Sequence, residues 1–118
     1  MRSTRQPGVR ERFYVQWAED AVRDLEEMVS YVAADSPINA RKLLTKLRGR
    51  AESLKRTPDR GRVVPELAHF GIRTWRELLV YPHRIIYRRA QRRVIVLAVI
   101  DGRRYLEDLL LERLLRSE

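Results

Sequence analysis

The sequence contains no cysteine among its 118 residues, so disulfide bonds and thiolate metal sites are excluded. Because disulfides belong to oxidising compartments, their absence favours a reducing one. Long hydrophobic runs are also missing, since the longest, residues 94–100, has seven residues and a membrane-spanning helix needs about 20. The residues after Met1 are polar and lack the apolar stretch of a signal peptide. We therefore expect a soluble, cytoplasmic protein that does not associate with membranes.

Size and composition predict a single folded domain. Hydrophobic residues make up 44% of the chain, too many for a disordered segment and enough for one packed core. Residues 1–12 are polar and contain Pro7-Gly8, which predicts a flexible lead-in. We assign residues 13–118 to one domain and expect it to need neither a metal ion nor another cofactor.

Positive charge is concentrated in the middle of the chain. The formal net charge is +9, and residues 41–104 hold 18 Lys and Arg against 5 Asp and Glu. A positive field of this kind is typical of proteins that bind a polyanion. It is also compatible with an ordinary solvated face rich in arginine.

The hydrophobic pattern predicts an α+β fold. Residues 13–17 have the composition of a short strand, and two amphipathic helices follow, separated by Ser36 as N-cap and Pro37 at the first helical position. Three strands are expected at residues 72–80, 84–87 and 93–100, joined by short connections that make them antiparallel. The last of these is apolar on both faces, which suits a strand covered on two sides. A C-terminal helix at residues 105–116 completes a domain in which an N-terminal strand and a helical hairpin pack on an antiparallel sheet.

Five short segments in this order resemble the RelE/ParE superfamily of toxins from type II toxin–antitoxin systems, closer to its ParE-like branch. They are 17–25 (WAEDAVRDL), 36–40 (SPINA), 54–66 (LKRTPDRGRVVPE), 76–87 (RELLVYPHRIIY) and 101–104 (DGRR). The resemblance implies a basic toxin that arrests bacterial growth and is neutralised by a cognate antitoxin. ParE-like members inhibit DNA gyrase, whereas members resembling RelE and YoeB cut messenger RNA on the ribosome. We predict the ParE-like function and keep the ribonuclease as the alternative.

The resemblance to the ribonucleases nominates three catalytic candidates, each with a structural alternative. Glu66 would be the base that activates the 2′-hydroxyl, or a carboxylate paired with a nearby arginine. Arg84 would bind the phosphate, or would cover the sheet and pair with Glu77. Tyr105 would be the acid, or would anchor the last helix through its ring. Nothing matches the aromatic and histidine-containing tail of YoeB-like enzymes, and this incomplete set favours a toxin that only binds its target.

Further residues are candidates for binding surfaces. Polyanion or target binding is predicted for a set of basic side chains that could equally be solvated charges: Arg76, Arg103, Arg104, Lys42 and Lys46. The leucines of the last helix form a face wider than one small core needs, and we predict that Leu106, Leu110 and Leu114 bind the antitoxin. The alternative is that these leucines only seal the chain's own core. No helix–turn–helix motif is visible, so a DNA-binding module acting alone is less favoured.

Overall fold

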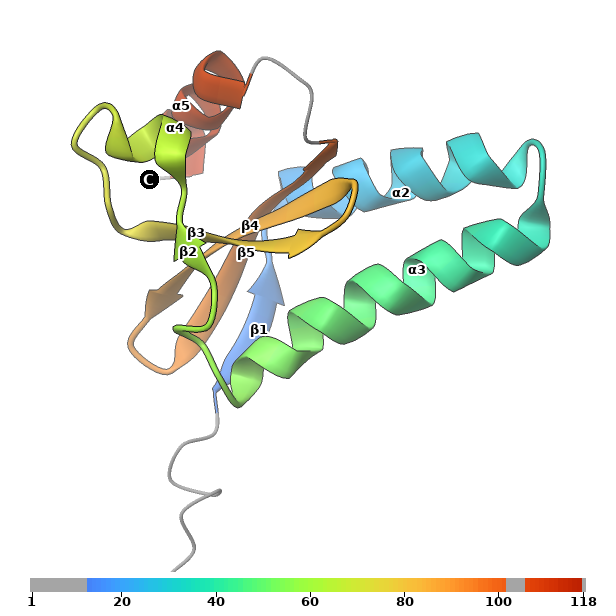
Figure 1. Ribbon diagram of the computed structural model, residues 1–118, viewed down its shortest axis with the longest axis horizontal. Coiled ribbons are helices and arrows are strands. Elements are labelled where there is room, and N and C mark those ends of the chain that lie inside the picture. Colours follow the sequence, from blue (N-terminus) through green and yellow to red (C-terminus); the bar gives the residue numbers. More distant parts are fainter. Residues whose placement is uncertain (1–12, 102–105, 118) are drawn as a thin grey trace, which may run out of the picture.

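A five-stranded sheet forms the centre of the computed structural model, which describes residues 13–101 and 106–117. Its strands are β1 (Tyr14–Trp17), β2 (Arg62–Val63), β3 (Trp75–Val80), β4 (His83–Ala90) and β5 (Arg93–Asp101). They lie in the order β1-β5-β4-β3-β2 (Figure 1). The three long strands pair antiparallel, as their short connections predicted. The α+β fold class is therefore confirmed.

The N-terminal strand belongs to the sheet, which the sequence analysis did not anticipate. β1 pairs with β5 in parallel, with Val15 opposite Val94 and Trp17 opposite Val96. Between these two strands the chain runs through both long helices and three other strands. Periodicity within a five-residue segment holds no information about a partner so distant in the sequence, so only the tertiary structure places this edge strand.

Helices α2 (Glu19–Ala33) and α3 (Pro37–Glu52) form the expected antiparallel hairpin on one face of the sheet (Figure 1). α3 begins as predicted, because the Ser36 hydroxyl accepts a hydrogen bond of 3.2 Å from the Asn39 amide and Pro37 occupies the first turn. α2 has no side-chain cap, and Glu19 and Asp20 in its first turn complement the positive end of its dipole instead. A 3-10 turn, η1 (Ser53–Lys55), continues α3.

Two short helices cover part of the other face. α4 (Pro65–Ala68) and α5 (Leu106–Ser117) enclose a second apolar cluster that includes Trp75, Leu97 and Leu110. A larger cluster under the hairpin is built around Leu47, Tyr87 and other residues of the opposite face. β5 supplies side chains to both clusters, which confirms that its apolar run is a strand covered on two sides.

Two element boundaries differ from the prediction, and two short elements were missed, for local reasons. β3 begins at Trp75 rather than residue 72, while Ile72 packs against the second cluster from the preceding loop. β4 extends to Ala90, since Arg88 and Arg89 continue its pairing with β5. β2 and α4, of two and four residues, were missed because elements this short have no measurable period.

Candidate functional site

The two strongest catalytic candidates meet in a buried ion-pair cluster between α4, β3 and β4. Arg84 donates from Nη1 and Nη2 to the two carboxylate oxygens of Glu66 at 2.9 and 2.8 Å. Its Nε donates to Glu77 at 2.6 Å, and Arg62 donates to the other oxygen of Glu77. The Glu77 side chain is fully buried and that of Arg84 is 10% exposed. The structural alternatives named for Glu66 and Arg84 are thus both present as contacts.

The charges of this cluster balance, since the two carboxylates pair with two guanidinium groups. The hydrogen bonds from Arg84 hold the pKa of Glu66 below its ordinary value, against a weaker opposing effect of burial. The same pairing raises the pKa of Arg84. Glu66 is therefore ionised near neutral pH with both oxygens engaged, and the guanidinium of Arg84 faces two carboxylates rather than an open surface.

Arg76 and the loop before β2 are held by a second set of contacts. Arg76 Nη1 donates to the Gly61 carbonyl at 2.7 Å, and the Gly61 amide donates to the Tyr87 hydroxyl at 2.9 Å. Tyr87 is fully buried, and burial raises the pKa of its hydroxyl. Arg76, predicted to bind a polyanion, thus positions the loop backbone in this structure.

The remaining predicted residues divide into three groups. Lys42 and Lys46 are exposed on α3, as a binding surface requires. Arg103, Arg104, Tyr105 and the side chain of Leu106 lie outside the described residues. Leu110 and Leu114, predicted to bind the antitoxin or to seal the chain's own core, are buried in the second cluster, at 0% and 8% exposure.

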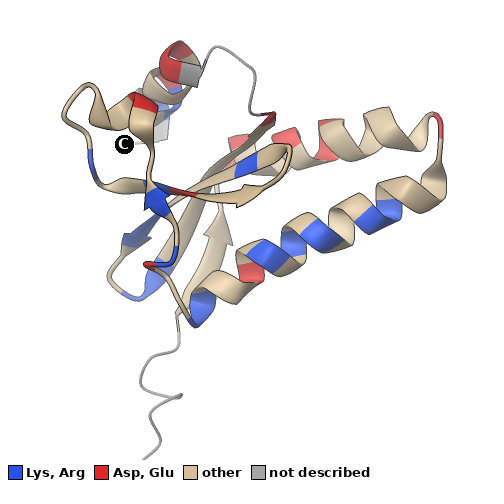
Figure 2. Ribbon diagram, viewed as in Figure 1, with Lys and Arg blue, Asp and Glu red and all other residues tan. Residues whose placement is uncertain are grey.

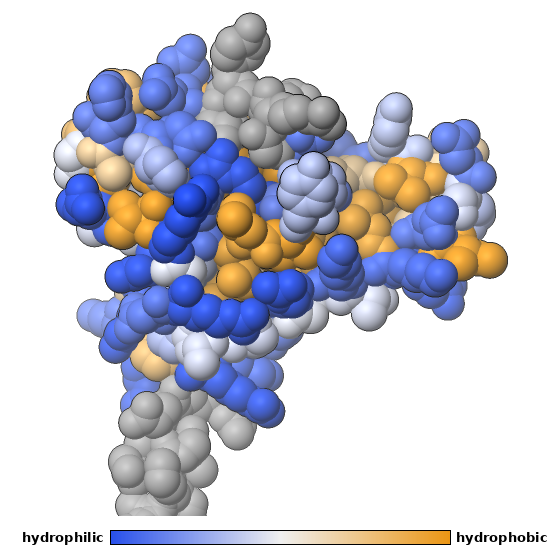
Figure 3. All heavy atoms as spheres, in the orientation of Figure 1, coloured by the Kyte–Doolittle hydropathy of each residue, from blue (hydrophilic) through white to orange (hydrophobic). Residues whose placement is uncertain are grey.

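A groove lies between the helical hairpin, the end of β5 and α5. It has a volume of about 630 Å³ and its apolar lining is Met28, Tyr31, Val32, Leu43, Val99, Ile100 and Leu109. In Figure 3, apolar side chains gather between the sheet and the hairpin, bordered by hydrophilic ones. Met28, Val32 and Leu43 lie on the apolar stripes of the two amphipathic helices, yet each is only partly buried.

The reason is geometric. α2 and α3 have 15 and 16 residues, or roughly 22–24 Å at 1.5 Å per residue. The hairpin extends past the edge of the sheet (Figure 1), so apolar residues near that edge, such as Met28 and Leu43, pack only partly against the core. Helix length compared with sheet width is the signal that could have indicated this groove.

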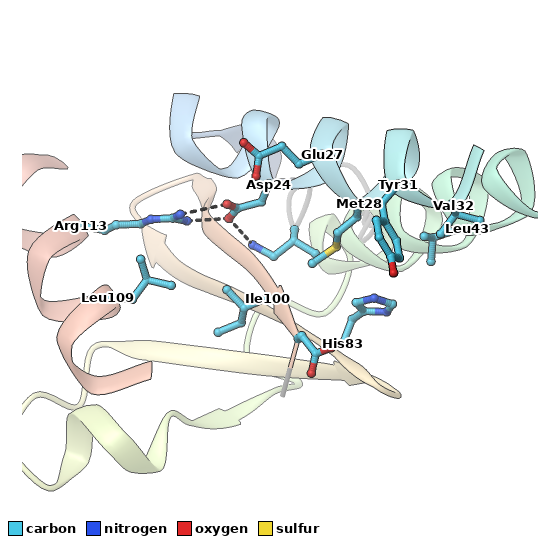
Figure 4. Close-up of a pocket in the computed structure, with 12 residues that line it drawn as sticks. Asp24, Glu27, Met28, Tyr31, Val32, Leu43, His83, Ile100, Leu109 and Arg113 are labelled. Atoms are coloured by element: carbon cyan, nitrogen blue, oxygen red, sulfur yellow. Dashed lines mark hydrogen bonds and ion pairs between the residues drawn. The ribbon is translucent and has the colours of Figure 1, made fainter. Parts of the chain in front are cut away.

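A polar clamp closes one end of the groove. Arg113 of α5 donates from Nη1 and Nη2 to Asp24 of α2 at 2.5 and 2.9 Å (Figure 4). Asp24 also accepts a 2.9 Å hydrogen bond from the Val99 amide of β5. The pairing with Asp24 raises the pKa of Arg113. One carboxylate thus joins two helices and a strand.

His83 lies in the same groove near Lys46 and Asp101. Burial lowers the pKa of its imidazole, opposed by the charge of Asp101 and reinforced by that of Lys46. In the described part of the chain, acidic and histidine side chains form no group of three that could hold a metal ion. None of its helices is both long and apolar enough to cross a bilayer.

Comparison with known proteins agrees with this architecture. The family model for the ParE toxin of the type II toxin–antitoxin system, parDE, matches residues 15–106, so the chain belongs to this family. Its fold is similar to that of a solved chain described as the chromosomal ParDE TA system from P. aeruginosa, with a TM-score of 0.62 and 18% identity. That match covers 77% of this chain and 97% of the other. No curated protein matches the sequence.

Proposed function

We propose that this ParE-family toxin inhibits DNA gyrase by binding it, and that its cognate antitoxin neutralises it by occupying the groove beside α2. The observation that supports the first part is that Glu66 and Glu77 both accept hydrogen bonds from Arg84. A ribonuclease needs a base that is available to take up a proton and a cation that faces the phosphate. A toxin that only binds its target needs neither.

The pairing energy of the cluster argues in the same direction. To act on RNA, Glu66 would have to release Arg84, which would leave a nearly buried guanidinium with less compensation. The lowered pKa of Glu66 also makes it a weaker base than an ordinary carboxylate. The arrangement therefore supports a structural role for both residues, as the anchor of α4 on the sheet.

The groove supports the second part of the proposal. Its apolar lining suits an amphipathic segment, which would gain most of its binding free energy from burying apolar surface there. The net charge of +9 would attract an acidic antitoxin and speed the encounter. α5 borders this groove with Leu109, while antitoxin contacts to Leu110 or Leu114 would require α5 to move.

Induction of the toxin in growing bacteria tests the target. We expect growth arrest with induction of the DNA-damage (SOS) response, and loss of supercoiling activity when purified toxin is added to gyrase. Glu66→Gln should retain this toxicity as long as it folds. Messenger cleavage at the ribosomal A site, lost by orders of magnitude in Glu66→Gln, would overturn the gyrase proposal in favour of the ribonuclease.

Two tyrosine variants test the groove without disturbing the core. Tyr31 lines the groove yet is 84% exposed, so a change there leaves the core intact. Tyr14 on β1 is 68% exposed and does not line the groove, so it serves as the control. Tyr31→Glu should weaken antitoxin binding at least tenfold by calorimetry, whereas Tyr14→Glu should leave it unchanged. The antitoxin is sought in the adjacent reading frame. Equal binding by both variants and the parent would exclude this groove as the antitoxin site.

A further inference from the structure

The arginines of this chain are held in two chemically different ways. Those of the buried cluster and of α5 are paired with carboxylates, as in Arg84 with Glu66 and Arg113 with Asp24. In that setting the pairing cancels most of the positive charge. Such arginines contribute to the fold and not to an external field.

Three arginines near the β4–β5 turn, Arg88, Arg89 and Arg93, have mainly uncharged partners among the described residues. Arg88 lies over the Trp75 ring at 5.4 Å, and Arg93 donates to the Gln16 side chain at 3.2 Å. Arg89 lies over the Phe13 ring at 4.9 Å. It also pairs with Asp59, and the side chains of Arg89 and Asp59 are each about half exposed. An aromatic face or an amide orients a guanidinium without neutralising it. These side chains are thus positioned in advance and keep most of their charge.

Basic residues of η1 and the following loop lie beside this turn. The Phe13 amide donates to the Lys55 carbonyl, and Arg89 reaches Asp59 of the loop. We name as the basic pole the six residues Lys55, Arg56, Arg60, Arg88, Arg89 and Arg93. Among the residues that the structure describes, Glu52 and Asp59 form ion pairs within it, and six basic against two acidic side chains leave its formal charge positive.

The basic pole continues along α3. Arg41, Lys42, Lys46 and Arg48 are exposed on this helix, whereas α2 carries most of the acidic residues of the hairpin (Figure 2). On the hairpin side of the sheet, positive charge therefore runs from Lys55 and Arg89 along α3, a helix roughly 24 Å long. Arg88 and Arg93 lie at the same end of the sheet on its other face, near Trp75 and Gln16. The β4–β5 turn lies at the opposite end of its strands from His83 and Asp101, which line the proposed antitoxin groove. On α3, Lys46 lies near His83 and so borders that groove.

We propose that the basic pole and the exposed face of α3 bind the phosphodiester backbone of double-stranded nucleic acid, independently of sequence. Guanidinium groups match the geometry of phosphate oxygens and grip two of them at once. A duplex presents such phosphates in a continuous row, which an extended row of fixed cations can follow. The proposal does not rest on the gyrase target or on the antitoxin groove.

Fluorescence anisotropy with the full chain tests this directly. The probes are a labelled 20-base-pair DNA duplex, an RNA duplex of the same length, and polyglutamate of equal charge. We expect both duplexes to bind at about 10⁻⁶–10⁻⁴ M in physiological salt, with an affinity that falls steeply as salt rises. Polyglutamate should bind at least tenfold more weakly. A tenfold difference in affinity between the DNA and RNA duplexes would show which nucleic acid this surface prefers. Equal affinity would mean that it recognises the phosphates alone.

A pair of charge-matched double variants locates the surface. Arg89→Gln with Arg93→Gln removes two charges from the basic pole, and Arg23→Gln with Arg116→Gln removes two from arginines paired with Asp20. The side chains of Arg89, Arg23 and Arg116 are 48%, 61% and 54% exposed, so these changes are comparable. The first pair should lower affinity about tenfold and reduce the salt slope by about two, at about 0.9 per phosphate contact. The second should change affinity less than twofold.

Three results would overturn the proposal: equal weakening by both double variants, unchanged binding by the basic-pole variant, or polyglutamate binding as tight as the duplexes. Thermal melting confirms that each variant is folded. If the basic-pole variant does not fold, Lys42→Gln with Arg48→Gln tests the same surface on α3, and unchanged duplex binding by that variant counts equally against the proposal.

Discussion

Asp24 and Arg113 lie 89 positions apart in the sequence and form a two-pronged ion pair with hydrogen bonds of 2.5 and 2.9 Å. Asp24 also accepts the Val99 amide, so a single side chain connects α2, β5 and α5. Arg116 adds a 3.0 Å contact to Asp20 one turn earlier on α2. The C-terminal helix is therefore fixed to the hairpin by charge on one side and to the sheet by Leu110 on the other.

Loss of this clamp should destabilise the fold measurably. Asp24→Asn removes the charge that compensates Arg113, and each side chain is only 12% exposed. Breaking such a pair should lower the free energy of unfolding by about 2–4 kcal/mol. Urea denaturation followed by tryptophan fluorescence measures it. Arg23→Met, which breaks an exposed pair with Asp20, is the control and should change stability by less than about 0.5 kcal/mol.

Two glycines should respond in opposite directions to the same substitution. A Cβ at Gly61 would collide with the Glu77 carbonyl and lie 2.8 Å from the Tyr87 hydroxyl, whereas one at Gly49 would meet nothing within 4 Å. Gly61→Ala should therefore cost several kcal/mol, about as much as an overpacked core site. Gly49→Ala, within α3, should raise stability by about 0.5–1 kcal/mol. Thermal melting of both proteins checks the pair, and a neutral Gly61→Ala would contradict the tight packing of this loop.

Acid sensitivity should depend on Glu66. The pKa of its carboxyl is lowered from 4.5, chiefly by Arg84, so the folded state favours the ionised form. The stabilisation is complete above that ordinary value and is lost as pH falls through the lowered value in the folded protein. Glu66→Gln should consequently be less stable than the parent at pH 7, with the difference shrinking toward pH 3. Urea midpoints across this range measure it, with the exposed Glu26→Gln as control; a difference independent of pH would disprove the linkage.

The leucines of α5 should separate by burial. Leu110 is fully buried and Leu115 is 81% exposed on the same helix. Leu110→Ala should cost about 2–5 kcal/mol through the cavity it leaves, whereas Leu115→Ala should stay within about 0.5 kcal/mol. Chemical denaturation of the two variants tests whether α5 belongs to the core. If both substitutions change the free energy of unfolding equally little, Leu110 does not seal the core and is available to bind the antitoxin.

Local pattern alone was sufficient for most of the fold. Ser36-Pro37 predicted the start of α3 because capping depends on neighbouring residues only. The apolar run of β5 predicted a strand covered on both sides, since burial on two faces removes the alternation of polar and apolar residues. The order of segments, with their local motifs, was also enough to identify the toxin family.

Tertiary structure decided which residues remain available for function. From the sequence, Glu66 and Arg84 could be a catalytic pair or a structural one, because nothing local states where Arg84 points; the fold surrounds it with two carboxylates. From the sequence, the leucines of α5 could bind a partner or seal the core; in the structure, Leu110 packs in the second cluster on the other side of the sheet. The groove shows the reverse case. Met28 and Leu43 are apolar helix positions of the kind that a core buries, but they pack only partly against the core and line the groove, because the hairpin extends past the edge of the sheet. Periodicity determines which face of an element is apolar, but only the packing of distant elements determines whether that face is covered.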